Sequence, residues 1–345
     1  MMPGLKLFTY PLEDCHLEPG FPYRPVPVLN EPNPQFFESV SSPAMADFIV
    51  FPVCLTDVGA SHAADGEYVY SYLQGLPHFQ HFPARHIFFL PGVDTWAPLF
   101  TSAVTFRTSL HRRMLDLNAV AIPYYQEQVT ELLDYSEVVY NTIFAGFLGS
   151  WPGRVDLIRA LSQTRNVNCW SKGMEKYHHH LSPEKRAEDL QAYREQLRRT
   201  ITVCCPRGAG LNSIRFFETL AAGRIPILIS DDCVLPMEAQ LDYSAFSLRL
   251  PEARIPEIGA FLADWFGKTP ADTIARMCEA ARHAWEEHLG PTAQERLVVN
   301  ALHRIKNANY RLNVAQMADV ELLRQMTRKS PKKSGYPQKQ VSQRS

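Results

Sequence analysis

The residues best suited to chemistry lie in one stretch, Cys204–Pro236, which reads CCPRGAGLNSIRFFETLAAGRIPILISDDCVLP. An apolar run ends at Pro206, and a turn that contains two glycines leads into a helix expected from about Asn212. Glycines allow close backbone approach to a ligand, and a helix N-terminus attracts anions, phosphate above all. The pattern therefore indicates phosphate binding by Arg207, Gly208, Gly210 and Ser213, although a tight strand-to-helix turn without a ligand fits it equally.

Two charged residues follow on the same helix, Arg215 and Glu218. An arginine can form paired hydrogen bonds with a phosphate. Glu218 stands in an otherwise mainly apolar helix, so its carboxylate is expected either in solvent or on a sugar hydroxyl.

A second interpretation of this stretch is a dinucleotide site. Gly208-x-Gly210-x-x-Ser213 is similar to the G-x-G-x-x-G/A fingerprint, and Asp231 and Asp232 follow the next expected strand, where a ribose-binding acid would stand. Against it, serine replaces the third glycine and the turn comes after residue 200 instead of in a first βαβ unit.

The whole stretch resembles the core motif of exostosin-like glycosyltransferases, glycosyltransferase family 47. The resemblance extends to Leu241–Ser247 and to Phe147-Leu148-Gly149 followed by Arg154, whereas Arg224 departs from the cysteine common in the family. The matching residues of the core motif are Pro206-Arg207-Gly208, Ser213, Arg215, Glu218, Gly223, Ile225-Pro226-Ile227, Ser230-Asp231 and Leu235-Pro236.

The resemblance implies an α/β protein of the GT-B fold, in which two Rossmann-like domains face each other across a cleft. The second domain would bind a nucleotide-sugar donor, a UDP-sugar above all, and the first a glycan acceptor. The sugar would move to an acceptor hydroxyl with inversion. The chain shows no D-x-D pair, so we expect no metal or other cofactor, and the departing diphosphate would be stabilised by the helix N-terminus. The donor-site residues would be Gly149, Arg154, Arg207, Gly208, Gly210, Ser213, Arg215 and Glu218.

Two other functions stay open at this stage. One is a catalytically silent relative that binds a nucleotide sugar, and the other is an NAD-dependent oxidoreductase. A transferase also needs a base near the acceptor hydroxyl. Asp94, expected after a strand end, is the candidate, with Asp57 a weaker one, and a loop or cap role fits both. His178-His179-His180 fits a polar loop better than a metal site, because neighbouring residues rarely converge on one ion.

The composition is that of a folded protein. The chain has 345 residues, of which 46% are hydrophobic and 21% charged, and its net charge of -1 demands no nucleic acid partner. Seven cysteines without a C-x-x-C pair are typical of the reduced thiols of a cytoplasmic protein. No apolar run approaches the roughly 18 residues of a membrane helix.

The pattern of elements predicts two domains, 1–140 for the acceptor and 141–290 for the donor. Helices at 291–327 would cross back to the first domain, and 328–345 would be a disordered basic tail capable of weak contact with a membrane surface. The strands are expected at 47–51, 86–90, 118–122, 142–148, 167–170, 201–205, 225–229 and 246–250. The helices are expected at 66–76, 155–161, 183–198 and 212–222, and from about 254, 271 and 292.

Overall fold

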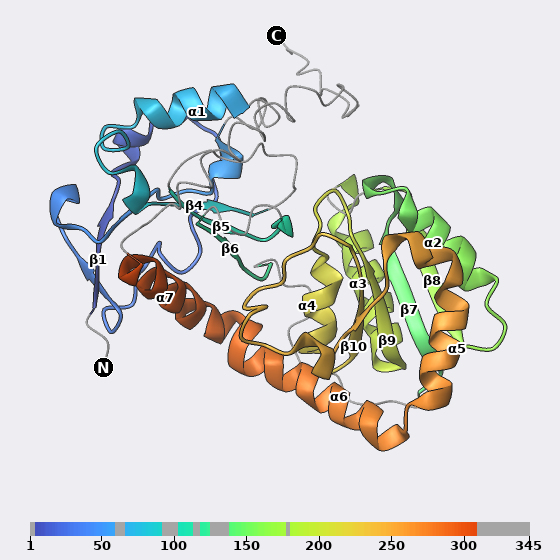
Figure 1. Ribbon diagram of the computed structural model, residues 1–345. Coiled ribbons are helices and arrows are strands. Elements are labelled where there is room, and N and C mark those ends of the chain that lie inside the picture. Colours follow the sequence, from blue (N-terminus) through green and yellow to red (C-terminus); the bar gives the residue numbers. More distant parts are fainter. Residues whose placement is uncertain are drawn as a thin grey trace, which may run out of the picture. The chain divides into compact units, whose positions relative to one another are not determined.

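The computed structural model describes residues 4–58, 66–91, 103–112, 118–124, 138–176 and 180–308. It is an α/β protein with two parallel sheets in one chain, as the GT-B expectation requires (Figure 1). Within the described ranges, no helix is both long enough and apolar enough to cross a bilayer.

The first sheet has six parallel strands in the order β2-β1-β3-β4-β5-β6. Most of its strands are short, and β3, β4, β5 and β6 are buried at every position, as expected of a parallel sheet with both faces covered. The strands are β1 Leu5–Thr9, β2 Phe37–Ser39, β3 Phe48–Val50, β4 His86–Leu90, β5 Val104–Arg107 and β6 Ala119–Ala121.

Helices from distant parts of the chain cover the two faces of this sheet. The helix α1 (Gly66–Gly75) contributes Leu73 to the core on one face. The helix α7 (Pro291–Asn307) packs Val298, Leu302 and its neighbours against the strands on the other face. The last described helix therefore completes the core of the first sheet.

The second sheet has five parallel strands in the order β11-β10-β9-β7-β8. Alternate residues of a strand point to opposite faces, so the neighbours Cys204 and Cys205 of β9 belong to different core layers. The strands are β7 Tyr140–Phe147, β8 Cys169–Met174, β9 Thr200–Pro206, β10 Ile225–Ile229 and β11 Leu248–Arg249.

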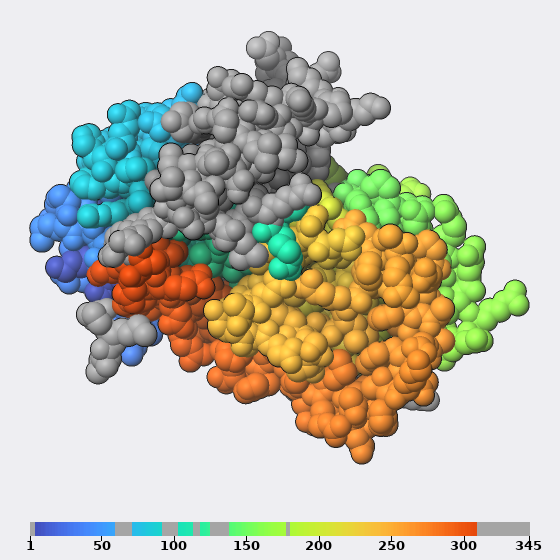
Figure 2. Space-filling view, viewed as in Figure 1, coloured from blue at the N-terminus to red at the C-terminus, as the bar shows by residue number. Residues whose placement is uncertain are grey.

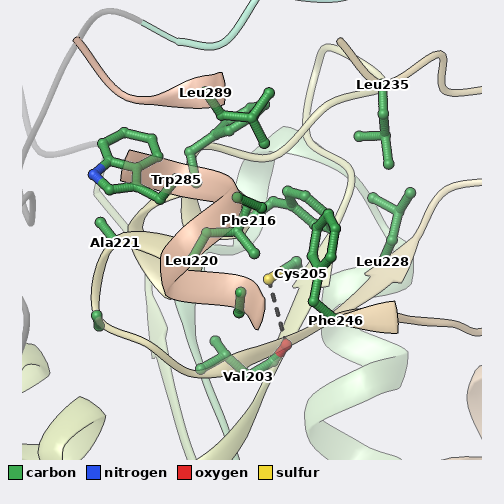
Figure 3. Packing of buried hydrophobic residues seen from close by; sticks show 14 of the residues in the cluster. Val203, Cys205, Phe216, Leu220, Ala221, Leu228, Leu235, Phe246, Trp285 and Leu289 are labelled. Atoms are coloured by element: carbon green, nitrogen blue, oxygen red, sulfur yellow. Dashed lines mark hydrogen bonds between the residues drawn. The ribbon is translucent and has the colours of Figure 1, made fainter. Parts of the chain in front are cut away.

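Five helices build those two layers. The layer shown in Figure 3 joins β9, α4 and the residues after α6, and in it the Cys205 Sγ donates to the Val203 carbonyl at 3.3 Å. Helices α2 and α5 pack on the other face, and α5 and α6, orange in Figure 2, form much of the visible surface of this half. The helices are α2 Gly153–Ser162, α3 Pro183–Arg198, α4 Ile214–Ala221, α5 Ile258–Lys268 and α6 Ala271–Ala284.

Both sheets have the doubly wound strand order 2-1-3-4-5, counted along the chain within each sheet, and β6 adds a sixth strand to the first. In this order the connections switch sides between the first and third strands, and ligands bind at the carboxyl ends of the strands there. In the second sheet that switch point lies between β7 and β9.

Several element predictions agree closely with the structure. The bounds of β4, β10 and α3 are as expected, and the Ser182 hydroxyl caps α3 by accepting from the Lys185 N–H at 3.3 Å. The sequence analysis missed β1, β2 and β5. The predicted tail at 328–345 lies outside the described residues.

The seven cysteines all lie in the described ranges and carry thiols instead of disulfides, six of them buried. Burial in apolar surroundings raises the pKa of the Cys169 thiol to about 11 and that of the Cys204 thiol to about 12. These thiols are core side chains.

Candidate functional site

The turn between β9 and α4 lies at the carboxyl end of the second sheet. The Arg207 N–H donates to the Ile229 carbonyl at 3.0 Å, and the Gly208 N–H donates to the Gly210 carbonyl at 3.0 Å. Ser213 precedes α4 in extended conformation, and its hydroxyl makes no capping hydrogen bond. The first turn of α4 therefore has no hydroxyl cap, which suits an anion at this helix end.

Arg154, in the first turn of α2, lies across the switch point. Its Nε donates to the Arg207 carbonyl at 2.9 Å, its Nη1 to the Phe147 carbonyl at 2.9 Å, and its Nη2 to the Pro206 carbonyl at 3.4 Å. Phe147 and Pro206 are the last residues of β7 and β9, and Arg207 directly follows β9. Arg154 thus holds the two strand ends together and brings a positive charge to the switch point.

Two predicted glycines make room for this arrangement. A Cβ on Gly208 would come within 3.1 Å of the Arg154 Nη2. A Cβ on Gly149, in the short turn after β7, would come within 2.5 Å of the Phe147 ring. A side chain at position 149 would therefore require the Phe147 ring to shift, whereas one at position 208 would press on the movable end of Arg154.

Arg207, the first residue after β9, is partly exposed. Its Nη1 lies 3.9 Å from the Glu252 Oε1. The Glu252 N–H donates to the Asp231 Oδ1 at 3.0 Å, and the Asp231 N–H donates to the Glu252 Oε1 at 3.3 Å. Asp231 is thus tied to the start of the next segment, a turn role that differs from the ribose contact of the dinucleotide interpretation.

Arg215 and Glu218 form a buried ion pair on α4. The Arg215 Nη1 lies 2.5 Å from the Glu218 Oε2, and the guanidinium carbon lies 4.2 Å from the centre of the Tyr193 ring on α3. Burial raises the pKa of the Glu218 carboxyl, and the attraction of Arg215 opposes that rise. Burial alone would lower the pKa of Arg215, but the charge of Glu218, the hydrogen bond to it and the neighbouring Tyr193 and Cys205 together outweigh burial and raise that pKa. Since Glu218 is only 2% exposed, a solvent-exposed role for it is excluded.

Leaving Arg207 aside, three buried polar atoms in the stretch 204–236 have no hydrogen-bond partner among the described residues. They are the Asn212 Nδ2, the Glu218 Oε1 and the Ser230 Oγ. The Asn212 Oδ1 accepts from the Ser213 N–H at 2.8 Å, so the orientation of this amide is set. Buried polar atoms are nearly always satisfied, so three orphans around one turn indicate a site whose ligand would complete them.

The other predicted residues are placed as follows. Asp94 lies outside the described residues, as do His178 and His179, and the described part of the chain has no group of three metal-ligating side chains. Asp57 is held by Arg24, whose backbone N–H and Nε both donate to its Oδ2 at 2.9 Å. Because the guanidinium also reaches its other oxygen, Asp57 is poorly arranged to act as a base.

The sequence analysis missed a segment that contacts this site. The Ser109 hydroxyl, after β5, accepts from the Leu211 N–H at 2.8 Å. Leu110 and Arg112 continue the contact toward the residues after β10, where the Val234 N–H donates to the Leu110 carbonyl at 3.0 Å. The omission follows from missing β5, a strand of only four residues with a buried arginine at its end.

A sequence profile of the Exostosin GT47 domain matches residues 39–264 of this chain. The chain belongs to the exostosin GT47 family. The matched range includes the β9–α4 turn, the buried ion pair and β10, so the residues that carry the family resemblance are also the ones that build the site.

Individual relatives match over shorter stretches. Exostosin-1 of Drosophila melanogaster is 30% identical over 107 residues, 31% of this chain and 14% of the relative. A probable glucuronosyltransferase of Oryza sativa subsp. japonica is 32% identical over 89 residues, 26% of this chain and 20% of the relative. The aligned part is therefore no more than a fifth of either relative's length.

Among solved structures, Anabaena HepE in complex with UDP matches at 9% identity and a TM-score of 0.40, over 78% of this chain and 86% of that one. We draw no argument from a likeness at this level. The GT-B assignment rests on the two doubly wound sheets and on the family.

Proposed function

We propose that this chain is an inverting glycosyltransferase that moves a sugar from a nucleoside diphosphate sugar to a hydroxyl of a glycan acceptor. The observation that carries the proposal is the set of orphaned polar atoms around the β9–α4 turn, at the switch point of a doubly wound sheet. The family assignment supports glycosyl transfer as the chemistry.

The diphosphate of the donor would lie at the N-terminus of α4. There the backbone of Gly208 and Gly210 allows close approach, and Arg154 and Arg207 add positive charge. In a single displacement the negative charge grows on the departing diphosphate, so fixed dipoles and cations at that point lower the barrier. We propose that these groups replace a metal ion in stabilising the leaving group.

The sugar or ribose hydroxyls of the donor would complete the orphaned atoms. A hydroxyl can donate to the Glu218 Oε1 and accept from the Asn212 Nδ2. Arg215, which pairs with Glu218, would then hold that carboxylate in place and keep it ionised. The first sheet would carry the acceptor.

The relative from rice is named a probable glucuronosyltransferase, so UDP-glucuronic acid is the first donor to test. A thermal-shift panel on the full chain should compare UDP, GDP, CMP, ADP, NAD and their sugar nucleotides, with and without chelator. A ligand that binds the native state raises the unfolding midpoint.

We expect a chelator-resistant rise with UDP and UDP-sugars, followed by UDP release when glycan acceptors are added. A rise with NAD alone would overturn the proposal in favour of an oxidoreductase. Binding without transfer to any acceptor or to water would favour a silent relative.

A further inference from the structure

The segment after β5 forms a short antiparallel bridge with the segment after β10. His111 pairs with Cys233 in this bridge, and the Arg112 N–H donates to the Asp232 carbonyl at 2.9 Å. Ser109, two residues before His111, accepts from Leu211 in the β9–α4 turn. The bridge therefore holds His111 next to the site proposed for the donor.

The imidazole of His111 faces a carboxylate. Its Nε2 lies 3.4 Å from the Asp232 Oδ2, and the two side chains are 30% and 51% exposed. A carboxylate beside a histidine orients the ring and stabilises the imidazolium that forms when the ring accepts a proton. This is the arrangement that a general base requires.

The other charged groups around the bridge are already paired with one another. The Arg112 Nη2 lies 2.9 Å from the Glu238 Oε1, and the Arg249 Nη2 lies 3.1 Å from the same oxygen. Asp231 exchanges hydrogen bonds with Glu252. Of these acids, Asp232 is therefore the one in contact with His111.

His111 contrasts with two other groups of the described chain that could accept a proton. Asp57 has both oxygens engaged by Arg24. His86 is fully buried, with the Tyr10 hydroxyl at 2.8 Å from its Nε2 and the Phe82 carbonyl at 2.8 Å from its Nδ1. Asp57 therefore has its oxygens engaged and His86 has no exposed surface, whereas the His111 side chain is 30% exposed.

We propose that His111 is the general base of the transfer and that Asp232 positions it, an inference that rests on the proposed function. The imidazole nitrogen takes the proton of the acceptor hydroxyl while that oxygen bonds to the anomeric carbon. The bond from the anomeric carbon to the diphosphate oxygen breaks, and its electron pair leaves with the diphosphate. Asp232 stabilises the imidazolium until the proton passes to water.

The first test compares His111→Asn, Asp232→Asn and the matched control Arg112→Gln, which removes the ion pair with Glu238 from the same bridge. Donor binding is read from the midpoint shift with UDP, and turnover from UDP release with UDP-glucuronic acid, with glycans or water as acceptor. We expect His111→Asn to lose about 10²- to 10⁴-fold in kcat, the usual contribution of a general base. The shift with UDP should stay as in the wild type.

Asp232→Asn should lose less, about 10-fold, and move the acidic limb of the pH–rate profile to lower pH, because the neutral imidazole is then favoured. Arg112→Gln should keep turnover within about three-fold, as expected for an exposed pair. The assignment of His111 would be overturned if His111→Asn kept turnover within three-fold of wild type. It would also be overturned if Arg112→Gln lost as much turnover as His111→Asn.

A second measurement needs no turnover. Diethyl pyrocarbonate modifies accessible neutral histidines, and the exposed His283 of α6 provides an internal reference. Bound UDP-glucuronic acid should slow modification of His111 at least five-fold and leave His283 unchanged. Unprotected His111 with the donor bound would contradict the inference, whereas the absence of any midpoint shift with sugar nucleotides would instead contradict the proposed function.

Discussion

Both sheets have a switch point between their first and third strands, but the side chains there differ. In the second sheet, Arg154 donates to backbone carbonyls at the end of β7 and at and just after the end of β9. In the first sheet, Arg24 lies in the segment after β1 and Asp57 in the segment after β3. These two side chains form an ion pair. A carboxylate neutralises the charge of the arginine that it binds, whereas backbone carbonyls do not. The anion site proposed for the second half therefore depends on the side chains at its switch point and not on the strand order, which the two sheets share.

The largest change in stability is expected at the buried ion pair between Arg215 and Glu218 in the second half. Arg215→Met leaves the Glu218 carboxylate uncompensated, so we expect the free energy of unfolding in urea to fall by about 3–5 kcal/mol. The double variant Arg215→Met, Glu218→Leu should recover a large part of that loss. Arg159→Met on the exposed face of α2 is the control and should change stability by less than about 0.5 kcal/mol. Equal stability of Arg215→Met and wild type would show that the pair is not buried in solution.

A smaller effect is expected in the first half at His86, where burial lowers the pKa to about 4 from 6.5. Below pH 6.5 the unfolded chain binds a proton on this histidine, whereas the folded protein does so only near pH 4. Falling pH therefore favours unfolding in this window, and the stability lost through His86 reaches roughly 3 kcal/mol at 1.4 kcal/mol per pKa unit. Urea unfolding of wild type and His86→Asn between pH 7 and 4 should show a shallower pH dependence in the variant. Parallel curves would contradict this account.

Gly208→Ala is expected to weaken the binding of UDP by about 10-fold. The added Cβ would come within 3.1 Å of the Arg154 Nη2 and push the guanidinium off the strand ends. We expect the dissociation constant for UDP to rise by about 10-fold, or 1.4 kcal/mol, while stability changes little. Gly267→Ala on α5, where a Cβ meets nothing within 4 Å, is the matched control. Wild-type affinity in Gly208→Ala would separate Arg154 from donor binding.

The smallest change in stability is expected at the ion pair between Arg24 and Asp57 in the first half. Arg24 is 46% exposed and Asp57 11%, so Asp57→Asn should cost no more than about 1 kcal/mol of stability. Turnover should stay within about three-fold of wild type, because Arg24 already holds both oxygens. A loss above 100-fold would restore Asp57 as the base and break the contrast between the halves.

Much of the second half could be predicted from the sequence, because its signals are local. Ser182 and Pro183 mark the start of α3, Gly223 (φ 67°) follows the end of α4, and β10 is one apolar run. The residues of the β9–α4 turn were found in the same way. The burial of Arg215 and Glu218 was not, since it depends on α3, which packs Tyr193 against Arg215.

Arg224 shows the same limit of local signals. It departs from the family's usual cysteine, and the structure buries it completely. Its Nε donates to the Leu197 carbonyl and its Nη2 to the Arg198 carbonyl, each at 3.1 Å, so it binds the C-terminal end of α3. In the first half, β1 and β5 were missed because they are short and each contains a charged residue. His111 was missed together with β5.

The position of α7 has a consequence for synthesis. One face of the first sheet is covered by Val298, Leu302 and their neighbours, which follow the end of β6 at Ala121 by 177 (298 − 121) and 181 (302 − 121) residues. Domains that fold during synthesis generally do so from the N-terminus onward, but this sheet lacks its cover until the second half has been made. We therefore expect the nascent first half to expose an apolar face until α7 has been made, a state to which chaperones bind. A chain that stops before residue 291 should aggregate instead of folding as two independent halves.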